Sequence, residues 1–228
     1  MTCNLFFITD YSLIKGDEAY LFIISPIYKN IKNRSISNIS LGTFSGSETL
    51  SNSYKLAPDG LTPLPDYIDQ ALIGLLLGDG TLVKKYKGGG TYFKYAQGTN
   101  HTDYLYFLFN LFKEMEIVNM NKPYFGTSKV KGKSYHYYSF TTRSLKVFNN
   151  LHSSWYPSGV KVIPEKISEF LSPISLAYWL MDDGGWTKKG IHLNTNFFNL
   201  SDVERLVEIL ADKFGLKCSV HSRNRVYI

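Results

Sequence analysis

Two stretches of this chain repeat one pattern, an apolar run that ends on an aspartate followed by a glycine. The first covers residues 72–80, LIGLLLGDG, and the second covers residues 176–184, LAYWLMDDG. In a helix, side chains three and four positions apart share one face. Each apolar face therefore ends on a carboxylate, Asp79 in the first stretch and Asp183 in the second. The repeat predicts two similar core helices, each ending near its glycine.

An aspartate at the end of a helix is in an unfavourable position, because the helix dipole is negative there and the last carbonyl groups lack partners. A divalent cation such as Mg²⁺ relieves both problems, since carboxylate and carbonyl oxygens are its ligands. If the helices pack side by side, the carboxylates of Asp79 and Asp183 converge with the carbonyls of Gly78 and Asp182. Gly74, one turn before Gly78, then lets the helices approach closely. Ordinary polar helix ends are the alternative, and two copies of the pattern argue against it.

The positive charge of the chain is uneven. The whole chain has 25 Lys and Arg against 19 Asp and Glu, whereas residues 1–70 have 5 against 7 and residues 71–228 have 20 against 12. A basic body in a chain that is 15% aromatic predicts a polyanionic partner, with an ordinary basic surface as the alternative. Two cysteines argue against a disulfide framework. No apolar run approaches the roughly 20 residues of a membrane span, so we expect no membrane partner.

Periodicity and turn residues divide the chain into an extension and two similar units. Residues 1–63 form an N-terminal extension and linker, in which we expect weak order. The first unit, residues 64–165, is predicted to hold a helix at 67–79, strands at 81–86 and 91–97, a helix at 100–115, strands at 122–130 and 134–141, and a helix at 142–152. The second unit, residues 166–228, is predicted to hold a helix at 173–183, strands at 186–189 and 191–196, a helix at 201–215, and strands at 216–221 and 225–228.

Because both units follow the order helix, hairpin, helix, hairpin, we predict an internal duplication with pseudo-twofold symmetry. Nothing in the second unit corresponds to residues 142–161, so we expect it to be incomplete at its C-terminal end, as in a fragment or a truncated protein.

Helix-capping residues support these boundaries. Asp66 and Asn100 are expected to cap the first two helices, and Ser172 the helix before Asp183. Ser201 begins a capping box, and Gly215 is placed to end that helix.

Both repeats resemble the LAGLIDADG motif, and the chain is similar to the two-motif, single-chain LAGLIDADG homing endonucleases of organellar introns. Residues 175–185 carry the second motif, and residues 161–164 and 194–201 also match that branch. The resemblance covers residues 64–228. The chain departs from the motif at a few positions, none of them the eighth, which carries the metal-binding acid: Leu77, Gly78, Tyr178, Met181 and Asp182.

The resemblance implies an α+β fold of duplicated αββαββα units, which form a saddle with two antiparallel sheets in the DNA major groove. It implies cleavage of long double-stranded DNA sites with Mg²⁺, for which Mn²⁺ can substitute. Asp79 and Asp183 would be the catalytic metal ligands, and Gly78 and Asp182 would contribute backbone carbonyls. Lys161 would be the basic catalytic residue, with a solvated loop lysine as the alternative.

Strands alternate their faces, so every second residue of each sheet is expected to meet base edges. Asn and Gln suit adenine, whereas Arg and Lys suit guanine or phosphate. In the first sheet the candidates are Lys84, Tyr92, Lys94, Gln97, His136 and Tyr138. In the second sheet they are Trp186, Lys188, His192, Asn194, Asn196, Arg223 and Arg225. For any single candidate, ordinary solvated surface is the alternative.

Other functions remain open or are disfavoured. Some members of the resembled family act as RNA maturases that assist intron splicing, and a DNA-binding remnant with impaired cleavage is a further alternative. The sequence lacks a Gly-x-Ser-x-Gly elbow and a phosphate-binding P-loop, and its histidines lack metal-ligand spacing. We expect a monomer encoded in an organelle, the mitochondrion or the chloroplast.

Overall fold

The computed structural model describes residues 63–86, 89–187 and 190–228. Residues 1–62 of the predicted extension and Lys188 lie outside the described residues. Within the described part of the chain, no helix is long and apolar enough to cross a membrane.

Two helices lie side by side at the centre of the molecule, α2 (Asp66–Leu77) and α6 (Pro173–Asp183). Their contact depends on two glycines of α2. A Cβ atom on Gly74 would clash with the backbone oxygen of Ser175, and one on Gly78 would clash with the carboxylate of Asp182. The prediction that Gly74 and Gly78 permit close approach is therefore confirmed.

The first sheet lies on one side of this helix pair and has the strand order β1-β2-β4-β3. Its antiparallel strands are β1 (Thr81–Lys84), β2 (Thr91–Gly98), β3 (Tyr124–Val130) and β4 (Lys133–Thr141). After the 3₁₀ turn η2 (Thr99–His101), helix α3 (Thr102–Glu114) covers one face of the sheet. Phe112 of α3 stacks on Phe93 of β2 at 5.4 Å between ring centroids, and Phe109 meets Phe140 of β4 at 5.8 Å. Aromatic packing thus joins α3 to the sheet.

The second sheet lies on the other side and repeats the same topology in the order β5-β6-β8-β7. Its strands are β5 (Gly184–Thr187), β6 (Gly190–Leu193), β7 (Ser219–His221) and β8 (Arg225–Tyr227), and helix α7 (Leu200–Phe214) covers one face. Leu206 and Leu210 of α7 share a fully buried core with Leu193 and Val226. The two matching sheets confirm the predicted α+β fold and the internal duplication. Two short helices, α4 (Phe148–Trp155) and α5 (Ile167–Phe170), connect the halves.

Two of the predicted helix ends are confirmed. The Ser172 hydroxyl accepts a hydrogen bond from the backbone N–H of Ser175, and the Ser175 side chain reciprocates in a capping box, with Pro173 at the first helical position. Gly215 ends α7 in the left-handed conformation, with φ of 65°.

The other three predicted caps are wrong. Asp66 is the first helical residue rather than the cap, because Pro65 precedes it in an extended conformation and the Asp66 carboxylate accepts from Gln70. Asn100 lies inside η2 and caps nothing. Asn199, not Ser201, caps α7, since the Asn199 side chain accepts from the backbone N–H of Asp202.

The helix predicted at 142–152 begins later than expected, at Phe148. The preceding residues are held against β2, where the N–H of Thr142 donates to the carbonyl of Phe93 and the N–H of Leu145 donates to the carbonyl of Thr91. These tertiary hydrogen bonds replace the first turn of the expected helix.

Candidate functional site

The adjacent ends of α2 and α6 bring the two predicted acids together. Gly78 ends α2, Asp79 follows it, and Asp183 is the last residue of α6. The backbone N–H of Asp79 donates to Oδ2 of Asp182 at 2.8 Å, so a hydrogen bond joins the two helix ends directly. The negative charge of Asp79 contributes to the raised pKa of Asp183, after burial. The helix ends that carry Asp79 and Asp183 therefore lie together, as the sequence pattern predicted.

Lys161 reaches the end of α2 from the connection between α4 and α5. Its Nζ donates to the backbone carbonyls of Gly78 at 2.8 Å and Gly80 at 2.7 Å. Nζ also lies 5.9 Å from the centroid of the Phe198 ring, which belongs to the second half. Lys161 is therefore a partly buried residue of the site, and a freely solvated loop lysine is excluded.

The electrostatics of this cluster favour an additional cation. Burial raises the pKa of Asp182 to about 7, and burial followed by the charge of Asp79 raises the pKa of Asp183 to about 7. Burial also raises the pKa of Asp79, although Lys161, Gln97 and His101 act against it. Burial lowers the pKa of the Lys161 ammonium to about 8 despite the three carboxylates beside it. Burial thus disfavours the charged forms of all four groups, and a bound Mg²⁺, whose ligands are carboxylate and carbonyl oxygens, would favour ionised carboxylates here.

Sequence analysis missed the role of the Asp182 side chain. We expected only its backbone carbonyl to take part, but its carboxylate accepts from the N–H of Asp79 at 2.8 Å, from the Tyr95 hydroxyl at 2.6 Å and from Gln97 Nε2 at 3.2 Å. The residue that could have indicated this role is Gly78, because a glycine facing α6 leaves space that the Asp182 carboxylate can fill.

Each helix end also meets an amide group from the sheet of its own half. Nε2 of Gln97, in β2, donates to Oδ2 of Asp79 at 2.7 Å. Nδ2 of Asn194, just after β6, donates to the backbone carbonyl of Asp183 at 3.3 Å. Gln97 and Asn194 were predicted to contact base edges; instead both are bound to the cluster of acids.

Only two of the six candidates in the first sheet lie on its open face, the face away from α3. Directly paired residues of adjacent strands point to the same face of a sheet, and consecutive residues of one strand point to alternate faces. Tyr92 and Lys94 alternate with the buried Phe93 and therefore lie on the open face. The other four candidates lie on the core-bearing face rather than on the open face: Lys84, Gln97, His136 and Tyr138. The open face of β4 presents Tyr135 and Tyr137 instead.

The second sheet places two candidates on its open face, His192 and Arg225. They line a shallow depression of about 240 Å³ with Thr187, His221 and Tyr227. Trp186 pairs with Ile191 and therefore lies on the core-bearing face, although its side chain is 46% exposed.

The two remaining described candidates of the second half, Asn196 and Arg223, lie outside the strands. Asn196 does so because β6 ends at Leu193 rather than at 196. Asn196 is exposed after β6, and Arg223 is exposed in the turn between β7 and β8, with φ of 62°.

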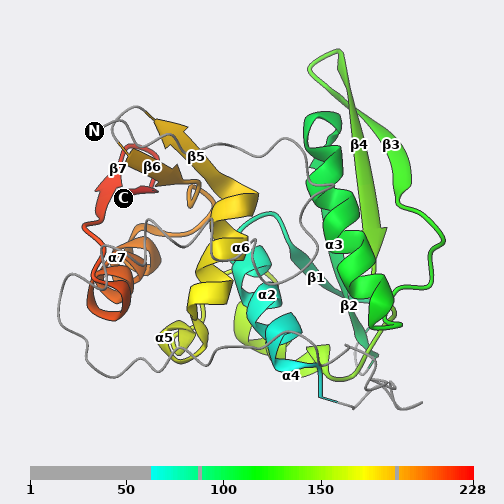
Figure 1. Ribbon diagram of the computed structural model, residues 1–228, viewed down its shortest axis with the longest axis horizontal. Coiled ribbons are helices and arrows are strands. Elements are labelled where there is room, and N and C mark those ends of the chain that lie inside the picture. Colours follow the sequence, from blue (N-terminus) through cyan, green and yellow to red (C-terminus); the bar gives the residue numbers. More distant parts are fainter. Residues whose placement is uncertain (1–62, 87–88, 188–189) are drawn as a thin grey trace, which may run out of the picture.

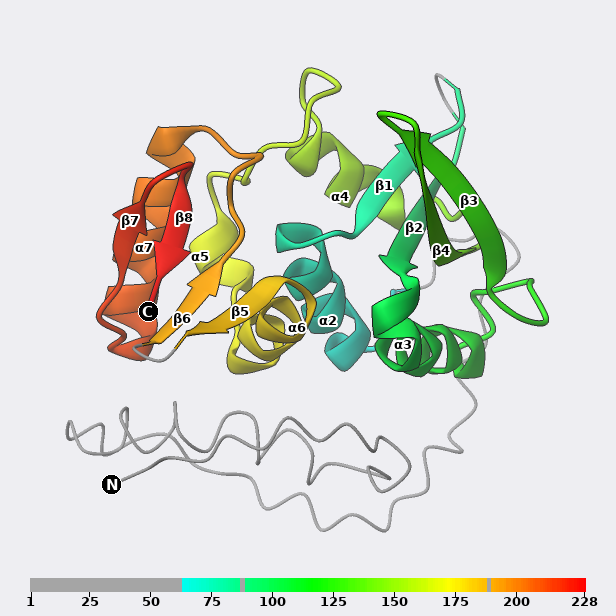
Figure 2. The same cartoon turned by 90° about the horizontal axis from the view of Figure 1, so that it is seen from above.

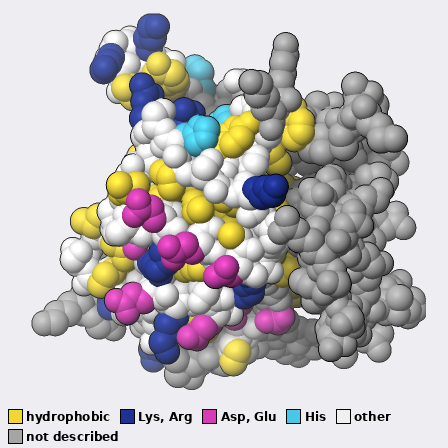
Figure 3. Space-filling view, turned by 90° about the vertical axis from the view of Figure 1, so that its left-hand side faces the viewer, with side chains coloured by type: hydrophobic (Ala, Val, Ile, Leu, Met, Phe, Trp, Pro, Cys, Tyr) yellow, Lys and Arg dark blue, Asp and Glu magenta, His cyan; other side chains and the backbone are white. Residues whose placement is uncertain are grey.

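The outer flank of the second half, formed by α7, carries several exposed acids. Figure 3 shows acidic side chains gathered over the side of the molecule formed by α7. Exposed acids on that helix are Glu204, Glu208 and Asp212. This flank is therefore unsuited to a polyanion, in contrast to the open faces of the two sheets.

A metal site here has to combine side chains with backbone. Among the residues that the structure describes, no three His, Cys, Asp or Glu side chains are arranged to hold a metal ion. Asp79 and Asp183 would thus act with the carbonyls of Gly78 and Asp182. The Gly78 carbonyl already accepts from Lys161, but a carbonyl oxygen has two lone pairs and can serve both partners.

Acids at the ends of two packed helices, flanked by matching antiparallel sheets, are the arrangement that the family resemblance implied. The chain belongs to the LAGLIDADG DNA endonuclease family, whose sequence profile matches residues 69–228. This confirms the family resemblance stated from the sequence.

Two curated relatives and one solved structure show what the chain is similar to. It is 38% identical over 160 residues to the cytochrome b mRNA maturase bI2 of Debaryomyces hansenii and 31% identical over 220 residues to that of Saccharomyces cerevisiae. These matches cover 70% and 93% of this chain, and the chain spans 61% and 49% of the two relatives. The homing endonuclease I-WcaI, bound to its DNA recognition sequence, is 26% identical with a TM-score of 0.66, and the match covers 82% of this chain and 84% of that one.

Proposed function

We propose that this protein is a site-specific endonuclease that hydrolyses phosphodiester bonds of double-stranded DNA with the help of Mg²⁺. The observation that carries the proposal is the meeting of Asp79, Asp183 and Lys161 at the joined ends of α2 and α6. The similarity to DNA-bound I-WcaI supports DNA as the substrate.

Asp79 and Asp183 would hold Mg²⁺ together with the carbonyls of Gly78 and Asp182. When bound, the ion supplies neutralisation of phosphate charge and activation of water, and Mn²⁺ is expected to substitute. The residues of the chain support this chemistry. Lys161, whose pKa is about 8, is mostly protonated at pH 7 and adds positive charge beside the carboxylates. Its two carbonyl partners hold the ammonium in place.

We assign DNA contacts to the open faces of both sheets. Tyr92, Lys94, Tyr135 and Tyr137 present aromatic and basic groups from the first sheet. From the second half, side chains suited to base edges and phosphates come from the sheet and its turns: His192, Asn196, Arg223 and Arg225. Two such faces in one chain fit a long target site and action as a monomer.

The cleavage test uses a plasmid that carries the intronless form of the gene whose intron encodes this protein. Asp79→Asn or Asp183→Asn is expected to lower the Mg²⁺-dependent cleavage rate by at least about 10²-fold, as for loss of a charged group at the reaction centre. DNA binding is expected to remain. Asp66→Asn, at the far end of α2, is the matched control and should cleave normally. Undiminished cleavage by both active-site variants would refute the proposal.

Binding of intron RNA is a second candidate function. The names of the two curated relatives, both cytochrome b mRNA maturases, favour it. They also support our proposal that the protein is encoded in an organelle, the mitochondrion or the chloroplast. Stimulation of splicing that survives both aspartate substitutions would make RNA maturation the main role. DNA binding without cleavage, even with Mn²⁺, would identify a DNA-binding remnant.

A further inference from the structure

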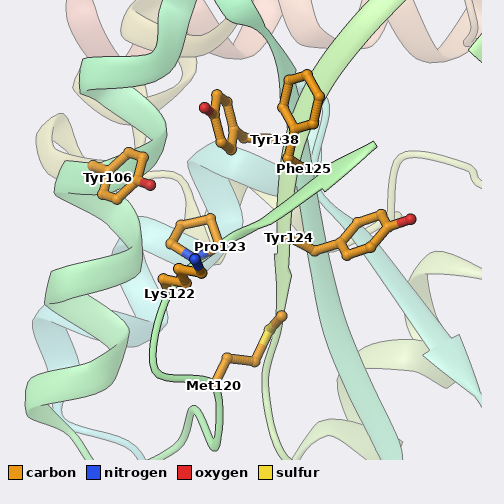
Figure 4. A pocket seen from close by; sticks show the side chains of 7 residues that line it. All are labelled: Tyr106, Met120, Lys122, Pro123, Tyr124, Phe125 and Tyr138. Atoms are coloured by element: carbon orange, nitrogen blue, oxygen red, sulfur yellow. The ribbon is translucent and has the colours of Figure 1, made fainter. Parts of the chain in front are cut away.

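A groove of about 390 Å³ lies at the outer edge of the first sheet, next to α3. Four of its seven lining residues are aromatic. In Figure 4, Tyr106 of α3 faces Tyr138 and Phe125 of the sheet across the groove, and Lys122 lies beside it with Pro123 and Met120, whereas Tyr124 points away. None of the residues that line the groove belongs to the cluster of acids at the ends of α2 and α6.

This groove is on the opposite face of the sheet from the one assigned to duplex DNA. Phe125 pairs with Tyr138, and Tyr138 pairs with Gln97 on the core-bearing face. Tyr92 and Lys94 occupy the other face. A duplex on the open face therefore leaves Phe125 and its neighbours without a role.

The rings at the groove form a continuous aromatic series. Tyr106 meets Tyr138 edge to face at 5.9 Å, Tyr138 meets Phe125 at 5.2 Å, and Phe125 stacks on His136 at 5.5 Å with planes 13° apart. Phe125 remains 49% exposed despite these contacts. Partly exposed, adjacent rings are the surface on which unpaired bases stack.

The charge of this region complements a nucleic-acid backbone. Residues 117–142, which include β3 and β4, contain four Lys and no Asp or Glu. Lys122 lines the groove itself, and Lys129, Lys131 and Lys133 lie along the β3–β4 hairpin. Basic groups beside stacking rings form the combination that single-stranded nucleic acids require.

We propose that this groove binds unpaired bases of single-stranded RNA. The inference rests on the second candidate function, RNA binding, and gives that function a surface separate from the DNA interface. RNA is the occupant because duplex DNA presents paired bases to the open face, whereas folded RNA presents unstacked bases in its loops.

The test measures fluorescence anisotropy of a labelled single-stranded RNA of about 12 nucleotides, a length within the range of such sites. Phe125→Ala is expected to weaken RNA binding about 5-fold to 150-fold, as for loss of one stacked base. Lys122→Gln should lower the slope of log affinity against log salt by about 0.7. Binding of duplex DNA should be unchanged in both variants, which also shows that they fold.

Tyr135→Ala is the matched control, since Tyr135 is 51% exposed but lies on the open face. It should bind RNA normally and duplex DNA more weakly. Absence of any RNA binding by the unaltered protein would overturn both the groove and the RNA function. RNA binding that Phe125→Ala leaves intact would overturn the groove alone. If the unaltered protein binds single-stranded DNA as tightly as single-stranded RNA, the groove is not specific for RNA and the proposed occupant is wrong. If Phe125→Ala abolishes self-association and leaves RNA binding intact, the groove binds a second copy of the chain instead.

Discussion

Asp182 shows how a single residue changes the electrostatics of the site. Its carboxylate is held by three donors yet almost removed from water, so burial raises its pKa to about 7. The Tyr95 hydroxyl and the Asp79 N–H stabilise the charged form only in part. The same carboxylate joins the ends of α2 and α6 through the hydrogen bond from the Asp79 N–H.

The raised pKa of Asp182 predicts how metal-free stability depends on pH. An acid whose folded pKa lies above its unfolded value of 3.8 stabilises the folded state at low pH, and that contribution is lost as pH rises toward 7. In the presence of a chelator, we expect the free energy of unfolding in urea to fall between about pH 4 and pH 7. Asp182→Asn should make this dependence less steep, and the raised pKa values of Asp183 and Asp69 should keep part of the slope. An equally steep profile in Asp182→Asn would contradict the assignment.

At the scale of helices and strands, the contact between α2 and α6 depends on Gly74. Gly74→Ala places a methyl group against the backbone oxygen of Ser175, which cannot move without shifting α6. We expect a loss of about 1–3 kcal/mol in the free energy of unfolding, the range for overpacking a close contact. Gly98→Ala is the control, because its Cβ atom meets nothing within 4 Å and its φ of −60° suits alanine. Calorimetry or urea unfolding distinguishes the two variants, and equal stabilities would show that the helices have room to separate.

The helices could be predicted from the sequence, but the faces of the strands could not. The apolar repeat ending in Asp79 and Asp183 is a local pattern, and it correctly indicated both central helices. The face of a strand residue depends on register, and an error of one position reverses every side chain. The sequence pattern selected Tyr138 as base-facing, whereas the register places Tyr137 on the open face, because Phe140, two positions after Tyr138, is buried. Asp182 was missed because its partners Tyr95 and Gln97 come from a distant strand.

At the scale of the whole molecule, the two halves share a fold but not the same active-site contacts. Lys161 binds the carbonyls of Gly78 and Gly80 at the end of α2. At the end of α6, the carbonyl of Asp183 accepts from the side chain of Asn194, and no ammonium group among the described residues makes the equivalent bond. Within the described part of the chain, the pseudo-twofold symmetry of the fold therefore does not extend to the hydrogen bonds made by positive charges at the two helix ends.

This asymmetry predicts that the two DNA strands are cut at different rates. With a supercoiled plasmid target, nicked circles should accumulate before linear product, because one strand is cut with the help of Lys161 and the other without it. Lys161→Met keeps the length of the side chain but removes its charge, and it should slow the faster cut by about 10²-fold, the usual effect of losing a charge-stabilising group. Lys166→Met, in the segment just before α5, is the control and should leave both rates unchanged. End-labelling of each strand measures the rates separately. Equal rates in the unaltered protein, or equal slowing of both cuts by Lys161→Met, would show that the charge of Lys161 serves both strands.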